Sequence, residues 1–188
     1  MDLQYLDLKL PLEQPERPDL GAFIPVFHRW VREQLGEGLL IDVADYRHVF
    51  AGPGVVLIGY DCNYSLDMTH NRPGLRCIRK TAVAGGARGA LTQGLRALNR
   101  ARTLLEQDAA FAGSLRFSRQ ILEVRVNDRL LAPNRPETFE ALRPDLTAFF
   151  ETLTGSGGAR LEFHPDARET FRVTVHAAAP LFAGNHAA

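Results

Sequence analysis

Apolar and polar side chains alternate with a period of two in several segments of the chain, which is typical of β-strands. The first such segment runs from Leu3 to Pro11, with its clearest alternation over 3–8. Further strands are expected at about 39–43, 54–60, 73–80, 115–117, 121–126, 161–163 and 171–175. The pattern therefore predicts strands in both halves of the chain.

Three other segments place apolar residues at helical spacing. The first begins after Asp19, which can cap a helix, and it ends near Gly36 and Gly38. Pro25 must lie in the first turn of this helix or kink it. A second helix is expected at 86–108, and a third follows Thr138 as its cap.

The second half of the chain echoes the first at an offset close to 119 residues. The correspondences pair 121–126 with 3–8, Thr138 with Asp19, Pro144 with Pro25, and Gly157-Gly158 with Gly36 and Gly38. A duplicated β-α-β-β unit is one explanation. A chance match between two segments of a common pattern is the other.

These elements predict an α+β fold with a mainly antiparallel sheet and helices packed largely on one face. A chain of 188 residues, 45% of them hydrophobic, can bury one sizeable core. We expect a single globular domain over 1–178, with halves 1–83 and 114–178 joined by the helix at 86–108. Residues 179–188 lack periodicity and are expected to form a loose tail.

Charge is balanced over the whole chain but unevenly distributed along it. Residues 1–71 hold five basic and eleven acidic side chains, whereas residues 72–119 hold ten basic and two acidic ones. We favour pairing of the two segments inside the fold or across a dimer over an anion-binding face, because a nucleic-acid binder usually carries net positive charge.

The two cysteines, Cys62 and Cys77, match no zinc-binding spacing and need no disulfide between them. The chain begins without a basic segment followed by an apolar run, and it contains no apolar stretch of membrane-spanning length. These features predict a soluble cytoplasmic protein with no membrane contact.

Polar and ionisable residues cluster directly after two apolar strands, where scaffolds often hold functional side chains. Asp42 is the strongest single candidate, because its neighbours Ile41 and Val43 predict partial burial and therefore a partner such as Arg76 or Arg79. The candidate ligand-binding site comprises Asp42, Asp45, Tyr46, His48, Asp61, Tyr64, Arg76, Arg79 and Lys80.

Two other functions are open. The first is a small metal-assisted hydrolase, because imidazole and carboxylate groups can bind a metal ion that activates water. The candidate ligands are Asp42, Asp45, His48 and Asp61, although their spacing matches no compact ligand motif. The basic segment 72–102 is a candidate surface for an anion or a nucleic acid. Covalent catalysis has no sequence support, and no motif identifies a cofactor or a catalytic residue.

Four blocks of the chain resemble a family of uncharacterised bacterial proteins. The blocks are FIPVFHRW (23–30), LLIDVADY (39–46), GPGVVLIG (52–59) and NDRLLAPN (127–134). The likeness covers most of the chain. The family pattern has His-Glu at the positions of Tyr60 and Asp61, which weakens the metal hypothesis further. Because the resemblance implies no reaction, the leading hypothesis is a dimeric ligand-binding or accessory protein whose ligand the sequence does not identify.

Overall fold

The computed structural model describes residues 3–13, 17–111, 113–155 and 158–182. The strands are β1 (Leu6–Pro11), β2 (Leu40–Tyr46), β3 (Gly54–Gly59), β4 (Cys62–Asp67), β5 (Gly74–Arg79), β6 (Ile121–Val126), β7 (Ala159–Phe163) and β8 (Phe171–Ala177). The α-helices are α1 (Phe23–Glu33), α2 (Gly86–Gln107) and α3 (Pro136–Thr154). Short 3-10 turns, η1 (Leu20–Ala22), η2 (Thr69–Asn71) and η3 (Ala109–Phe111), complete the described elements.

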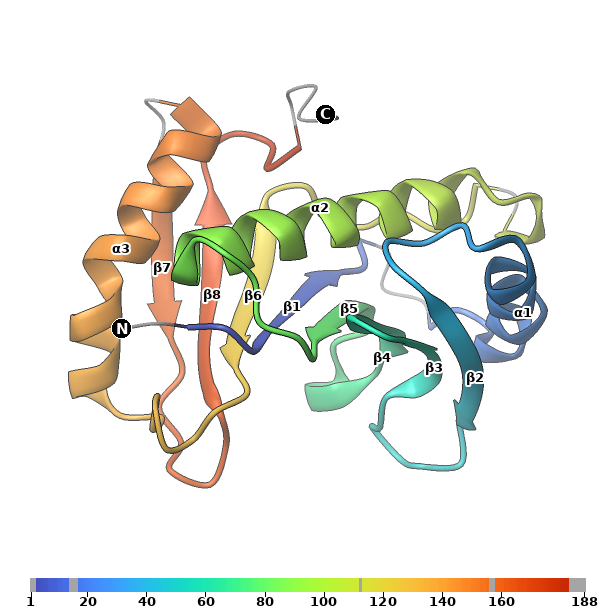
Figure 1. The fold of residues 1–188 in the computed structure, drawn as a ribbon, viewed down its shortest axis with the longest axis horizontal. Helices are drawn as coiled ribbons and strands as arrows, with labels where there is room; N and C mark the ends of the chain where they lie inside the picture. The colour runs from blue at the N-terminus through green and yellow to red at the C-terminus, as the bar shows by residue number, and fades with distance from the viewer. Residues whose placement is uncertain (1–2, 14–16, 112, 156–157, 183–188) are drawn as a thin grey trace.

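The eight strands form one sheet in the order β2-β3-β4-β5-β1-β6-β8-β7 (Figure 1). Every neighbouring pair is antiparallel, and the N-terminal β1 lies at the centre between β5 and β6. The predicted α+β fold with a mainly antiparallel sheet is therefore confirmed.

One face of the sheet carries the hydrophobic core beneath the helices. In β1, Leu6, Leu8 and Leu10 are buried on this face, and a Cβ atom at Gly94 of α2 would lie 2.8 Å from a methyl carbon of Leu8. Long α2 crosses the middle of the sheet, with α1 near β2 and α3 near β7 (Figure 1). Among the described residues the three α-helices all lie on this face, and we call the opposite face the open face.

Most expected elements are present, with three differences. The polar-looking segment 62–67 forms strand β4, which the sequence analysis did not predict. Segment 115–117 forms only an isolated bridge between Phe117 and Leu12. Thr138 does not cap the third helix, because Pro136 fixes a helical backbone two residues earlier and Arg135 occupies the cap position.

The first helix follows its predicted pattern more closely. Asp19 accepts a hydrogen bond from the Gly21 backbone and caps η1, which leads directly into α1. Pro25 is the third residue of α1 and therefore lies in its first turn, one of the two expected positions. The helix ends at Glu33, before Gly36 and Gly38.

The two halves place corresponding elements at corresponding positions of the sheet. The series β1-α1-β2-β3 and β6-α3-β7-β8 each put their second strand at an edge and their third strand beside it. The central strands β1 and β6 pair with each other, whereas β4 and β5 are inserted only in the first half. The topology is compatible with the expected duplication, which stays a prediction, as does the division into halves.

The end of the described chain packs against the rest. Leu181 is buried, and its backbone N–H donates to the carbonyl of Arg119. The remainder of the expected tail, from residue 183, lies outside the described residues, as does Gly157. Within the described ranges, no helix combines the length and the apolar character needed to cross a membrane.

Candidate functional site

The nine residues expected to form a ligand site lie in several places. Asp42, Asp45, Tyr46 and His48 are exposed on or after the edge strand β2. His48 and Asp61 flank opposite ends of the six-residue strand β3, and a strand of that length spans about 20 Å. Among the described residues, no three His, Cys, Asp or Glu side chains gather closely enough to hold a metal ion.

Asp42 is exposed, so the prediction of its partial burial is wrong. It lies on an edge strand, and its carboxylate accepts a hydrogen bond from the backbone N–H of Val43. Asp45 accepts from both the backbone and the guanidinium of Arg47, and these hydrogen bonds lower the pKa of Asp45 to about 2. Charged side chains on an edge strand discourage pairing with another chain, which gives both aspartates a structural explanation.

The other candidates divide between the two faces of the sheet. Tyr64 and Arg79 are buried on the core face, where Arg79 contacts Thr81 and the sulfur of Cys62. Thr81 in turn donates to Asp61, at 2.8 Å. Lys80 is exposed, whereas Arg76 lies on the open face.

The expected pairing of the basic segment with acidic residues inside the fold is confirmed for several side chains. Arg76 contacts Asp7 and Asp67, and Arg96 contacts Glu37 at 2.9 Å. These contacts leave less of the segment 72–102 available to a nucleic acid.

The open face holds the strongest concentration of buried charge among the described residues. Its side chains occupy the alternate positions of strands whose other positions carry the core. On the central strands they are Asp7 and Lys9 of β1, Arg76 of β5, Glu123 and Arg125 of β6, and Arg172 and Thr174 of β8. Asp67 of β4 lies on the same face, beside Arg76.

A balanced ion network occupies the β4-β5-β1 part of this face. Lys9 and Asp67, which are 1% and 0% exposed, form an ion pair of 2.6 Å, and Arg76 joins Asp67 to Asp7. Burial lowers the pKa of Lys9, although Asp67 opposes the shift. Burial acts to raise the pKa of Asp67, but the charges of Lys9 and Arg76 lower it overall. Each charge in this network has a close partner.

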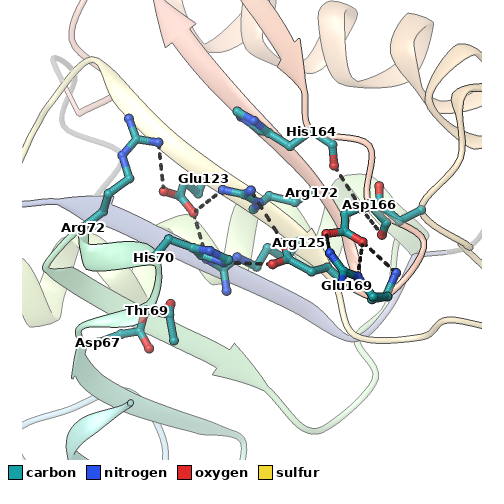
Figure 2. Close-up of polar contacts among 12 residues, drawn as sticks. Asp67, Thr69, His70, Arg72, Glu123, Arg125, His164, Asp166, Glu169 and Arg172 are labelled. Atoms are coloured by element: carbon teal, nitrogen blue, oxygen red, sulfur yellow. Dashed lines mark hydrogen bonds and ion pairs between the residues drawn. The ribbon is translucent and has the colours of Figure 1, made fainter. Parts of the chain in front are cut away.

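The neighbouring charges are less completely paired (Figure 2). We define the arginine cluster as Arg72, Arg125 and Arg172 around Glu123. Arg125 donates to Glu123 at 2.9 Å, whereas Arg72 and Arg172 approach the same carboxylate only to 3.8 and 4.0 Å. Among the described residues, Arg125 alone of the three guanidinium groups donates a hydrogen bond. Glu123 is 1% exposed and Arg72 is 50% exposed, so the cluster extends from a buried carboxylate to solvent.

Three polar atoms of this cluster are buried without a hydrogen-bond partner among the described residues. They are Oε1 of Glu123 and the Nε atoms of Arg125 and Arg172. Buried polar atoms are nearly always hydrogen-bonded, and an unpaired one costs about 1–3 kcal/mol. Half of the six such atoms found in the described residues belong to this one cluster. Additional partners for them would stabilise the protein.

Two histidines lie beside the arginine cluster. His70, in η2, approaches Glu169 to 3.7 Å, and His164, after β7, bonds Thr174 through Nε2 at 2.8 Å. Burial and the positive charge of Arg172 lower the pKa of both imidazoles. Burial acts to raise the pKa of Glu123, but Arg125, Lys9 and Arg172 lower it overall. At neutral pH the cluster therefore combines three guanidinium groups with two neutral imidazoles.

This site was not predicted from the sequence, although a signal for it exists there. Charged residues occupy alternate positions inside otherwise apolar strands, as in Leu6–Leu10 and Leu122–Val126. Such alternation predicts a charged sheet face. The sequence does not show which strands become neighbours in the sheet. The proximity of Arg72, Arg125 and Arg172 therefore could not be predicted from it.

Comparisons of the chain with protein-family models, with curated proteins and with solved structures found no match. The resemblance to the bacterial family stays a prediction, and so does the dimer.

Proposed function

We propose that this protein is a ligand-binding protein that holds a polar small molecule on the open face of its sheet, at the arginine cluster. The observation that carries the proposal is the set of three buried polar atoms in this cluster that lack hydrogen-bond partners. Acceptor groups of a ligand would supply partners for the two guanidinium Nε–H groups.

The distribution of exposure supports a site that a ligand can enter. Arg125 is buried, Arg172 is 14% exposed, and Arg72 is half exposed at the rim. A side chain that is already ordered and partly desolvated loses less conformational entropy when it binds than a free surface arginine does. The cluster therefore has the preorganised interior and the open rim that binding requires.

The contacts of Arg172 also support a functional rather than purely structural role. Its guanidinium approaches Glu123 to 4.0 Å and Glu169 to 3.7 Å, and both distances exceed those of a hydrogen bond. By contrast, Lys9 and Asp67 next to it form a close pair of 2.6 Å. An arginine held near carboxylates without bonding them remains available to a ligand.

Cytoplasmic location is part of the same proposal. Cys62 and Cys77 are both buried free thiols, which supports a reducing compartment.

The test is a thermal-shift screen of the whole protein against phosphate monoesters, dicarboxylates, sugars and amino acids, in a buffer free of phosphate and sulfate. We expect at least one class to raise the midpoint of unfolding saturably, because a ligand that binds only the folded state stabilises it. Arg172→Met should abolish the shift. Arg143→Met, which removes an exposed arginine paired with Glu140 on α3, should preserve it.

Two outcomes would overturn the proposal. One is the absence of a saturable shift with every class of compound. The other is a shift that persists unchanged in Arg172→Met, because the ligand would then bind elsewhere.

A further inference from the structure

We infer that the group recognised at the arginine cluster is a tetrahedral oxyanion, the phosphoryl or sulfuryl group of the ligand. This inference rests on the proposed function and narrows it to one chemical class. It depends on the directions from which the cations approach, on the local charge and on the unpaired guanidinium nitrogens.

Three guanidinium groups reach the cluster from three separate parts of the chain (Figure 2). Arg72 follows η2, Arg125 lies on β6 and Arg172 lies on β8. A planar carboxylate is satisfied by one guanidinium fork, whereas a tetrahedral oxyanion presents oxygens in several directions. Donors from separate elements therefore suit the tetrahedral group better.

The charge around the cluster leaves an excess of one positive charge. Arg72, Arg125 and Arg172 face the carboxylates of Glu123 and Glu169. On the adjoining strands the charges balance in one network, formed by Lys9, Asp67, Arg76 and Asp7. In the β7–β8 connection Asp166 pairs with Arg168. His70 and His164 can each add a positive charge when an anion binds beside them.

Glu123 takes the role of an internal counter-charge. Its Oε2 accepts from Arg125, and its Oε1 has no hydrogen bond from the described residues. Together with Glu169 it balances two of the three guanidinium groups, so the cluster stays ordered without being neutralised. The remaining donor capacity includes the terminal nitrogens of Arg72 and Arg172, which approach Glu123 and Glu169 only to 3.7–4.0 Å.

Isothermal titration calorimetry at low ionic strength tests the inference with three probes, namely inorganic phosphate, inorganic sulfate and malonate. Malonate carries two negative charges in planar carboxylates and is therefore the control for charge alone. We expect phosphate and sulfate to bind at one site per chain, at least about tenfold more tightly than malonate. A charged hydrogen bond contributes about 1.5–3 kcal/mol, so losing one weakens binding by about tenfold or more.

Arg172→Met should weaken phosphate and sulfate binding by at least that factor, and Arg72→Met should do so to a smaller extent because Arg72 is half exposed. Arg143→Met should bind as the unmodified protein does. Circular dichroism of each variant shows whether a loss of binding follows from a loss of folding, and Arg72→Met provides a second test at the exposed rim.

The outcomes separate this inference from the proposed function. If malonate binds as tightly as sulfate, or if another compound class alone gives the Arg172-dependent thermal shift, the inference fails and the proposed function stands. If phosphate and sulfate bind equally to all variants, the inference fails as well. If no compound binds in either experiment, both fail.

Discussion

At the scale of single residues, Glu123 has the most consequential position on the open face. It is almost completely buried and lies among three arginines, one of which it bonds at 2.9 Å. An ionised group in such a place persists because opposite charges compensate the cost of burying it. Removing the carboxylate charge should therefore affect stability and ligand binding in opposite directions.

Glu123→Gln should lower the free energy of unfolding by about 3 kcal/mol, because it leaves buried arginine charge uncompensated. The same change should tighten sulfate binding, since the resident counter-charge is gone. Urea unfolding and calorimetry measure the two effects. Glu140→Gln, at an exposed ion pair on α3, should change the free energy of unfolding by less than about 1 kcal/mol. Weaker sulfate binding in Glu123→Gln would contradict this role.

Sulfate affinity should rise as the pH falls from 7.5 to 5.5. The pKa values of His70 and His164 are lowered, so both imidazoles are neutral at pH 7.5 and gain protons towards acid pH. Sulfate keeps its charge over this range, and Glu123, whose pKa is also lowered, stays ionised. Calorimetric titrations at several pH values measure the trend, and the double variant His70→Gln, His164→Gln should flatten it. An unchanged slope in that variant would exclude the histidines as its source.

The candidate site shows what single residues can and cannot reveal in a sequence. Polar residues after the two predicted strands were expected to meet, but Asp42 is exposed at an edge and Tyr64 is buried in the core. The pairing of the basic segment with acidic residues was predictable from charge alone. The specific partners were not, because Arg76 and Asp7 are 69 positions apart and meet only through strand pairing.

At the scale of elements, β4 explains why one strand was missed. Cys62, Tyr64 and Leu66 point to the core, whereas Asn63 and Ser65 point to the open face. The period of two was present, but the polar members suggested a loop at a strand end. A strand that carries part of a charged face need not look apolar, so alternation is a better guide than hydrophobicity here.

Gly54 begins β3 and permits its close approach to β4. Its φ is +68°, and a Cβ atom there would lie 2.4 Å from the carbonyl oxygen of Leu66. Gly54→Ala should therefore lower the free energy of unfolding by more than about 2 kcal/mol, since backbone strain and a steric clash add together. Gly113 also has positive φ, at +76°, but no atom of the described part of the chain lies within 4 Å of its Cβ position.

Gly113→Ala is the matched control and should cost about 1 kcal/mol. Urea unfolding of both variants measures the difference. Equal losses of stability would show that the contact with Leu66 is unimportant and that backbone strain alone accounts for the effect at Gly54.

At the scale of the whole molecule, the sheet separates two environments. The helices lie over one face (Figure 1) and bury an apolar core there. The other face gathers charged residues from strands far apart in sequence. The arginine cluster crosses the central β1–β6 pair, because Arg72 lies between β4 and β5, whereas Arg125 and Arg172 belong to the second half of the chain. The site therefore forms only when the whole sheet is assembled.

The sequence predicted the class of this fold because alternation and helical spacing are local properties. It predicted the antiparallel sheet and most elements, including β6 with its observed bounds. The strand order was not predicted, since it depends on long-range contacts such as that between β1 and β6. Ligand recognition on the open face depends on that order, so the position of the site could not be predicted from the sequence.

The stability of the folded protein should decrease on acidification from pH 7 to 5. The folded-state pKa values of His70 and His164 lie below 6.5, so the unfolded state binds more protons between the two values. Their contribution is complete above about pH 6.5 and is lost as the pH falls through the folded pKa values. Asp67 and Glu123, whose pKa values are also lowered, add a further loss below about pH 4.5. Urea unfolding at several pH values measures this slope.

The double variant His70→Gln, His164→Gln should be less sensitive to acid between pH 7 and 5. A slope equal to that of the unmodified protein would assign the pH dependence to other groups.

The most direct test of the proposed function is a side-chain NMR titration of ¹⁵N-arginine-labelled protein with inorganic sulfate. The Nε–H groups of Arg125 and Arg172 have no hydrogen-bond partner among the described residues, so a bound oxyanion should shift their resonances saturably. The resonance of Arg143, exposed on α3, should stay in place. If the Arg125 and Arg172 resonances do not move, or if all three drift together without saturation, the arginine cluster is not an oxyanion site.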